Sequence, residues 1–156
     1  MSVKTTVRKQ HQATIAEAAA RPAQALMRPK EGWIATTRKA LGISGAQLGR
    51  KVGRTRANIS AAEQSEQNER ATLHTMKTMA EAMGCRFVYA IVPAKGGIDD
   101  VLKRQARRKA QALVTRASTH MALEKQALSA GKLDDEIERL ARELLQNPPS
   151  DFWEDE

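Results

Sequence analysis

Four short helical segments fill residues 33–84, and their start and stop signals restrict how this part of the chain can fold. Gly42, Gly53 and Gly84 each follow a stretch with the apolar periodicity of a helix, which is the position where glycine ends helices. Helices this short are marginal alone and gain most of their stability by packing an apolar face. The segment is therefore predicted to be a compact helical bundle.

The second and third segments indicate two helices joined by a tight turn. Ser44 can cap the second helix, and Gln47, three residues later, completes a capping box. Thr55 can cap the third helix, and Gly53 occupies the turn, where a positive φ is typically needed. Gly49 stands where the two helices must approach closely, because a larger side chain would separate them. These features predict a helix-turn-helix.

The start of the third helix carries the strongest functional signal. In a helix-turn-helix the second helix reads base edges with its N-terminal residues. Arg56 can pair bidentately with guanine and Asn58 with adenine. The amide ends of both helices suit phosphate contact. The predicted DNA-binding residues are Ser44, Gln47, Arg54, Thr55, Arg56, Ala57, Asn58 and Ala61.

Residues 33–84 resemble the Cro/repressor-type (XRE) helix-turn-helix domain. The resemblance rests on the closing stretch LHTMKTMAEAMG and on Arg38, Leu48, Gly49, Gly53, Thr55, Ile59 and Glu63. It implies that Arg38 in the first helix pairs with Glu63 in the recognition helix, as a structural pair and not a DNA contact. The sequence departs from the family pattern at Arg54, which is usually apolar, and at Ala62, which is usually Ile or Val.

A second resemblance covers nearly the whole chain. The stretches GWIATTRKALGIS, MGCRFVYAIVP and THMALEKQ, in this order and spacing, resemble the family called mobile mystery protein A. Members of that family are typically encoded beside a Fic-domain protein. The resemblance therefore implies a toxin–antitoxin-like pair in which this chain is the DNA-binding member.

Residues 85–93 break the helical period and indicate a short strand that Pro93 ends. A lone strand needs a partner for its backbone groups, and the sequence offers no second strand. The economical prediction is the same strand of a second copy, paired about a two-fold axis. An edge hairpin with a segment of the same chain is the alternative. The predicted dimer strand consists of Arg86, Phe87, Val88, Tyr89, Ala90, Ile91 and Val92.

The remaining segments flank this bundle. Residues 1–31 form a basic arm with a short helix before Pro22, and residues 98–147 form a helical extension. The tail, residues 148–156, places Phe152 and Trp153 among acidic side chains. The two aromatic residues are predicted to anchor a partner protein, since tryptophan often dominates such contacts. The alternative is that the tail folds back onto the extension.

The net charge of +8 is unevenly distributed along the chain. Residues 1–70 carry 13 basic and 5 acidic side chains, whereas residues 132–156 carry 3 basic and 9 acidic side chains. A basic body with an acidic tail favours a polyanionic partner for the body and a separate role for the tail.

Several classes of protein are disfavoured. Cys85 is the only cysteine, so no intrachain disulfide or thiolate zinc cluster can form, and the three histidines lack a metal-binding spacing. No nucleophile–base pair, carboxylate dyad or phosphate loop is evident, so neither an enzyme nor a cofactor is expected. No apolar run approaches the length of a membrane span, and a cytoplasmic location is expected.

The sequence as a whole predicts a mainly α protein: a repressor-like helix-turn-helix bundle in residues 32–84, one short β-strand that pairs across a dimer, and a C-terminal helical extension. The expected function is sequence-specific regulation of transcription, with the homodimer on a pseudo-palindromic operator and a Fic-domain toxin as partner. The alternative is an antitoxin that acts mainly by binding its toxin through the helical C-terminal part.

Overall fold

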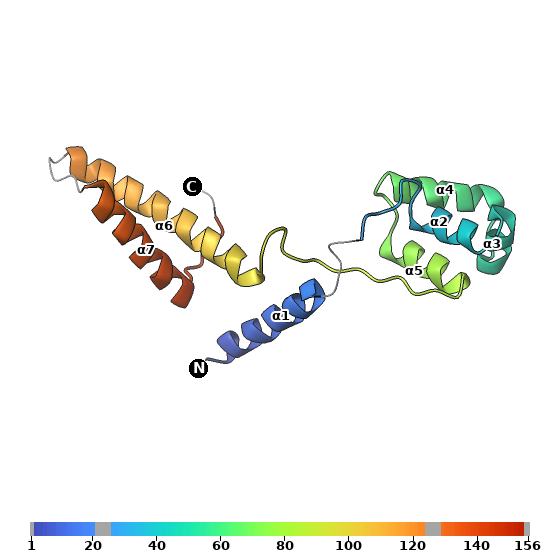
Figure 1. Ribbon diagram of the computed structural model, residues 1–156, viewed down its shortest axis with the longest axis horizontal. Helices are drawn as coiled ribbons and strands as arrows, with labels where there is room; N and C mark the ends of the chain where they lie inside the picture. Colours follow the sequence, from blue (N-terminus) through green and yellow to red (C-terminus); the bar gives the residue numbers. More distant parts are fainter. Residues whose placement is uncertain (1, 21–25, 124–128, 155–156) are drawn as a thin grey trace. The chain divides into compact units, whose positions relative to one another are not determined.

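The computed structural model describes residues 2–20, 26–123 and 129–154, and these residues form seven helices and no strand (Figure 1). The chain divides into two compact units. One unit is Pro22–Ala90, and the other combines Met1–Arg21 with Ile91–Glu156. The predicted helical character of the chain is therefore confirmed for the described residues.

The first of these units, here called the helix-turn-helix unit, is a four-helix bundle (Figure 1). Its helices are α2 (Trp33–Ala40), α3 (Gly45–Val52), α4 (Arg56–Gln67) and α5 (Leu73–Ala82). Leu48, Ile59 and Met79 are almost completely buried where the four helices meet. The other buried members of this core are Ile34, Ala62, Met76 and Met83. Each helix thus contributes one apolar face, as the periodicity predicts.

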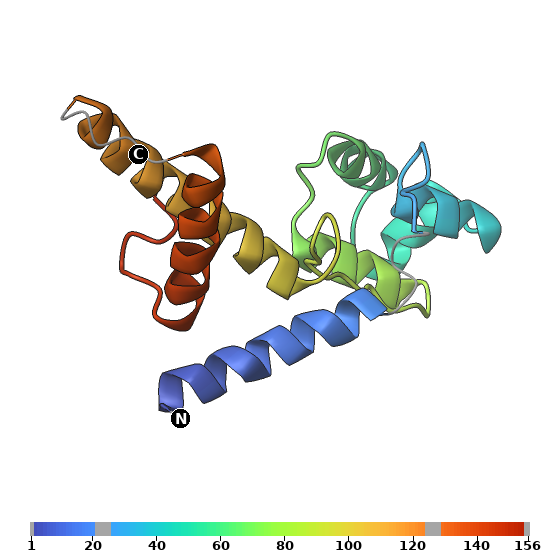
Figure 2. The ribbon, with the colours of Figure 1, turned by 60° about the vertical axis from the view of Figure 1, so that its left-hand side comes forward.

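The second unit is built on a helical hairpin, in which α6 (Ile98–Leu123) and α7 (Ala130–Gln146) lie side by side (Figures 1 and 2). Ala106 and Ala110 of α6 are fully buried, and their small side chains let α7 approach closely. Ile137, Ala141 and Leu144 supply the facing side of α7. The same unit includes α1 (Val3–Ala20), which has no buried residue.

The strand expected at residues 86–92 does not form in the single chain. These residues have neither helical nor strand geometry, and none of their backbone groups hydrogen-bonds to another backbone group in the described part of the chain. The physical reason is that a strand exists only as part of a ladder, and none of the described segments is a strand that could pair with it. The pairing across a dimer therefore remains a prediction.

Three stretches of the predicted organisation lie outside the described residues. They are residues 21–25 of the basic arm, residues 124–128 of the helical extension and residues 155–156 of the tail.

Candidate nucleic-acid interface

The turn between α3 and α4 is held by two glycines with different roles. Gly53 ends α3 in the left-handed region at φ 67°, which glycine adopts without steric cost. Gly49 lies against the chain that follows, because a Cβ atom built there would come within 2.6 Å of the Arg54 carbonyl oxygen. The two helices can therefore cross at this distance only because position 49 has no side chain.

Replacing Gly49 with alanine is expected to lower the free energy of unfolding of the helix-turn-helix unit by about 1–3 kcal/mol. The added methyl group would meet backbone atoms of Arg54 and Thr55, which cannot move without separating α3 from α4. Urea unfolding followed by Trp33 fluorescence, in a Trp153→Phe background, measures the change.

The matched control is Gly45→Ala, at the start of the same helix. A Cβ atom there would lie 3.6 Å from the Arg56 Cγ atom, which is ordinary van der Waals contact. Alanine also has the higher helix propensity, so this variant is expected to be no less stable than the parent. If Gly49→Ala unfolded at the same urea concentration as Gly45→Ala, the close approach would not limit the turn.

The N-terminus of α4 is closed by a reciprocal cap between Thr55 and Asn58. The Asn58 amide N–H donates to the Thr55 hydroxyl oxygen at 3.1 Å, and the Thr55 amide N–H donates to Asn58 Oδ1 at 3.3 Å. The Thr55 hydroxyl also donates to Asn58 Oδ1, at 2.7 Å. Bidentate recognition of adenine requires the oxygen and the nitrogen of the Asn58 amide together. In this structure the Asn58 oxygen accepts the hydrogen bonds of the cap, so the role that Asn58 has here is that of a helix-capping residue.

Ser44 and Gln47 form an equivalent cap at the start of α3. The Ser44 amide N–H donates to Gln47 Oε1 at 2.7 Å, and the Gln47 amide N–H donates to the Ser44 hydroxyl at 3.1 Å. This is the predicted capping box. The cap leaves the amides of Gly45 and Ala46 at the helix end, where backbone N–H groups favour an anion.

Four exposed basic side chains lie on this helix pair, in the last turn of α3, in the turn that follows and at the start of α4. They are Arg50, Lys51, Arg54 and Arg56. None of the four is engaged by an acidic side chain within the described residues. Unpaired cations on one helix pair are available to neutralise the phosphates of a nucleic acid.

Apart from Arg56, the exposed side chains in the first two turns of α4 are small. Ala57 and Ala61 are exposed and lie four residues apart, so they share a face of the helix. Arg56 lies beside the start of α3, where it lines an open hollow with Ser44 and Gly45. A helix start with one long basic residue among small side chains can lie deep in a groove and still contact base edges.

Behind this surface, Arg38 joins three parts of the bundle. Its Nε atom donates to Glu63 Oε1 at 2.6 Å, and a second guanidinium nitrogen donates to the Ile43 carbonyl oxygen at 3.0 Å. Both charged side chains are about 85% buried, since their exposed fractions are 16% and 15%. The structure thus brings together Arg38 of α2 and Glu63 of α4, and it places this pair in the scaffold that positions α4.

Glu66 is a structural residue that the sequence reasoning missed. Its carboxylate is buried and accepts the amide N–H groups of Trp33, at 2.5 Å, and of Ile34, at 2.9 Å. The N-cap residue of α2 is Gly32, which has no side chain for this purpose. The last turn of α4 therefore caps α2. The only available signal was that α2 begins without a capping residue of its own.

The tail of the second unit contains one buried and one exposed aromatic residue. Phe152 is only 3% exposed and packs in the α6–α7 core, and its carbonyl oxygen accepts a hydrogen bond from Gln105 Nε2 at 2.7 Å. Trp153 stacks edge-to-face on Phe152 and is 59% exposed. Phe152 is therefore not a free anchor for a partner, and the alternative that the tail folds back describes it. The reason is that burial of an aromatic ring in the core removes a large apolar surface from water. Trp153 stays accessible.

An ion pair fastens the same tail. The buried Lys109 ammonium donates to Asp151 Oδ2 at 3.1 Å, and this hydrogen bond holds the pKa of the Asp151 carboxyl below its usual value. Further along the hairpin, Arg107 of α6 pairs with Glu138 of α7. Part of the basic stretch in α6 is thus used inside the unit.

Within the described residues, no group of three or more His, Cys, Asp or Glu side chains could hold a metal ion. None of the described helices is long and apolar enough to cross a membrane. A comparison of the chain with protein-family models, with curated proteins and with solved structures finds no match.

Proposed function

We propose that this protein is a sequence-specific DNA-binding regulator of transcription. The observation that supports the proposal most is the exposed start of α4, where Arg56 stands beside Ala57 and Ala61 on a helix held by the Gly49–Gly53 turn. Such a helix presents its N-terminal side chains to the major groove, while the capped helix ends contact phosphates. The proposed site of action is the cytoplasm.

We propose further that the regulator acts as a homodimer on a pseudo-palindromic operator. Two copies related by a two-fold axis would place their recognition helices in successive major grooves, about 34 Å apart. The segment 86–92 supports this proposal, because its backbone groups have no backbone partner among the described residues and a second copy can supply a ladder.

The decisive experiment compares two labelled duplexes by fluorescence anisotropy across a salt series. One duplex comes from the region upstream of this gene, and the other has the same composition in scrambled order. A sequence-specific repressor prefers the upstream duplex near physiological salt and shows a steep salt dependence. Equal and weak binding to both duplexes would mean that the interaction is non-specific and electrostatic, and it would overturn the proposal.

Arg56→Ala is expected to weaken binding to the operator by about 1–3 kcal/mol, which is the value of one bidentate contact with guanine. Binding to the scrambled duplex is expected to change little, because a lost base contact carries no cost where no specific base is read. The same anisotropy titration, with both duplexes at one salt concentration, measures both effects.

Arg70→Ala is the matched control. Arg70 is exposed in the loop after α4, and its substitution removes the same charge from the same unit. It is expected to affect both duplexes slightly and equally. If Arg56→Ala lost the same affinity on both duplexes, the residue would be a phosphate contact and not a base reader.

Membership of the mobile mystery protein A family, and with it a Fic-domain toxin as partner, is a proposal supported by the resemblance in sequence. One structural observation favours a second function of this kind, protein binding by the C-terminal part. Trp153 is 59% exposed at the end of the α6–α7 hairpin, although a large aromatic residue is usually more deeply buried. Coexpression with the product of the neighbouring gene tests it: a Fic protein that copurifies with the parent but not with Trp153→Ala supports this function.

A further inference from the structure

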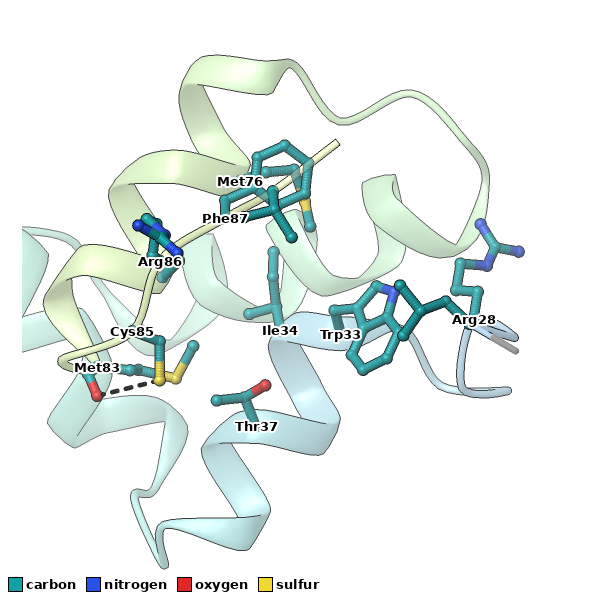
Figure 3. A pocket seen from close by; sticks show the side chains of 12 residues that line it. Arg28, Trp33, Ile34, Thr37, Met76, Met83, Cys85, Arg86 and Phe87 are labelled. Carbon is teal, nitrogen blue, oxygen red and sulfur yellow. Dashed lines mark hydrogen bonds between the residues drawn. The ribbon is translucent and has the colours of Figure 1, made fainter. Parts of the chain in front are cut away.

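An apolar hollow of about 420 Å³ opens on the helix-turn-helix unit, on the side of α2 and α5 (Figure 3). Trp33, Ile34 and Thr37 of α2 face Met76 of α5 across it, and Met83, directly after α5, lines it as well. Phe87 closes one side of the hollow and packs on the buried core. Trp33 is 40% exposed at this surface, so the hollow leaves large apolar side chains in contact with water.

The segment that forms this wall also exposes apolar side chains of its own. Val88, Tyr89 and Ile91 are 64%, 70% and 89% exposed, and they follow one another within four residues. Exposed apolar residues are ordinary when scattered, but a contiguous set beside an apolar hollow marks an interaction surface. An interface about a two-fold axis must be self-complementary, which means that one surface carries both the protruding and the receiving parts. Here the helix-turn-helix unit provides the receiving hollow, and residues 88–91 provide the protruding side chains.

We propose that the occupant of the hollow is Ile91 of a second copy, brought there by antiparallel pairing of residues 86–92 about a two-fold axis at Tyr89. The inference rests on the proposed homodimer and specifies its register. In that register Tyr89 lies opposite its own copy, and Ile91 of one chain lies opposite Phe87 of the other. Residues 87, 89 and 91 share one face of a strand, and the stacked rings of Phe87 and Tyr89, 5.6 Å apart, agree with this alternation.

The length of the segment supports this register over its neighbours. Tyr89 is the midpoint of residues 86–92. Gly84, which has a positive φ, and Cys85 precede this segment, and Pro93, which has no amide N–H to donate, follows it. An axis at the midpoint pairs all the residues of the segment, whereas any other axis leaves an end unpaired.

The charges agree with the same register. Arg86 has no ion-pair partner among the described residues, and like charges directly opposite each other destabilise a ladder. An axis at Tyr89 places each Arg86 opposite Val92 and separates the two guanidinium groups by the length of the ladder, about 20 Å.

Cysteine cross-linking of the full chain tests the register, in a Cys85→Ser background so that no other thiol is present. Tyr89→Cys is expected to form an intermolecular disulfide under mild oxidation, because directly opposed Cβ atoms lie about 4.5–5.5 Å apart. Ile91→Cys is the matched control, since the two copies of position 91 would lie about 13 Å apart along the ladder. Non-reducing electrophoresis reads both results.

A second pair of variants tests the contact with the hollow. Ile91→Asp is expected to raise the dimer dissociation constant at least tenfold by light scattering, because it places a carboxylate in an apolar site. Ala94→Asp introduces the same charge beyond Pro93 at an exposed position and is expected to leave the dimer unchanged. Far-UV circular dichroism checks that both variants keep their helices.

Two results would overturn the inference: a chain that is monomeric at all concentrations, or a disulfide through position 91 in place of position 89. The same samples are tested for binding to the upstream duplex. A cross-linked Tyr89→Cys dimer that binds no DNA would leave this inference intact and reject the proposed regulatory function.

Discussion

Phe152→Ala is expected to lower the free energy of unfolding of the α6–α7 hairpin by about 3–5 kcal/mol, the usual cost of removing a buried phenyl ring. Phe152 is 3% exposed and is the aromatic member of a core otherwise made of alanine and aliphatic side chains. Its loss leaves a cavity that these small residues cannot fill. The tail that carries it is also fastened by Gln105 and Lys109, so the segment would detach together.

The two tryptophans make this effect measurable in each unit separately. Trp33 belongs to the helix-turn-helix unit and Trp153 to the second unit, and the chain has no other tryptophan. In a Trp33→Phe background, urea unfolding followed by Trp153 fluorescence reports the hairpin. In a Trp153→Phe background, Trp33 reports the other unit, whose midpoint Phe152→Ala should not change.

Trp153→Ala is the matched control, because it truncates the neighbouring aromatic residue, which is 59% exposed. Circular dichroism is expected to show a loss of less than about 1 kcal/mol, as is common for substitutions outside a core. Equal effects of Phe152→Ala and Trp153→Ala would mean that the tail is not part of the hairpin core.

Glu66→Gln is expected to lower the free energy of unfolding of the helix-turn-helix unit by about 2–3 kcal/mol, because hydrogen bonds to a charged acceptor are strong and their loss leaves a buried donor unpaired. The carboxylate accepts two amide N–H groups, from Trp33 and Ile34, one on each oxygen. A glutamine side chain has only one oxygen, so its NH2 group would face one of these donors. The negative charge that favours the start of α2 is lost as well.

Trp33 fluorescence in the Trp153→Phe background measures this change. Glu81→Gln is the control, since it removes the same charge from an exposed position on α5 of the same unit. Its effect is expected to stay within about 0.5 kcal/mol. A Glu66→Gln variant as stable as Glu81→Gln would show that α2 does not depend on this cap.

Local signals predicted the helix-turn-helix well because they act over three or four residues. The hydroxyl caps at Ser44 and Thr55, the stop at Gly53 and the spacing of Leu48 and Ile59 each specify backbone geometry without reference to distant parts of the chain. The bundle follows because each helix has one apolar face to bury. The same logic failed for residues 86–92, because their β-type composition indicates a strand, and a strand forms only beside a pairing strand, which the described residues do not supply.

In the candidate site, two hydrogen-bonding roles could not be predicted from neighbouring residues alone. Asn58 has the side chain of an adenine reader, yet its position three residues after Thr55 makes it the second half of a cap, and only the hydrogen bonds of the folded chain show which use prevails. Glu66 lies 33 residues from the amide of Trp33 that it caps. No periodicity connects two such positions.

The sequence by itself determined the helices of the helix-turn-helix unit, the turn that joins α3 to α4 and the basic residues near it, because propensity, capping and charge are properties of neighbouring residues. Only the tertiary structure decided that Glu66 caps α2, that Lys109 is buried against Asp151, and that Phe152 enters the core while Trp153 stays exposed. These outcomes depend on which surfaces meet when the chain packs. Burial and long-range hydrogen bonds are shared between segments, so neither segment encodes them alone.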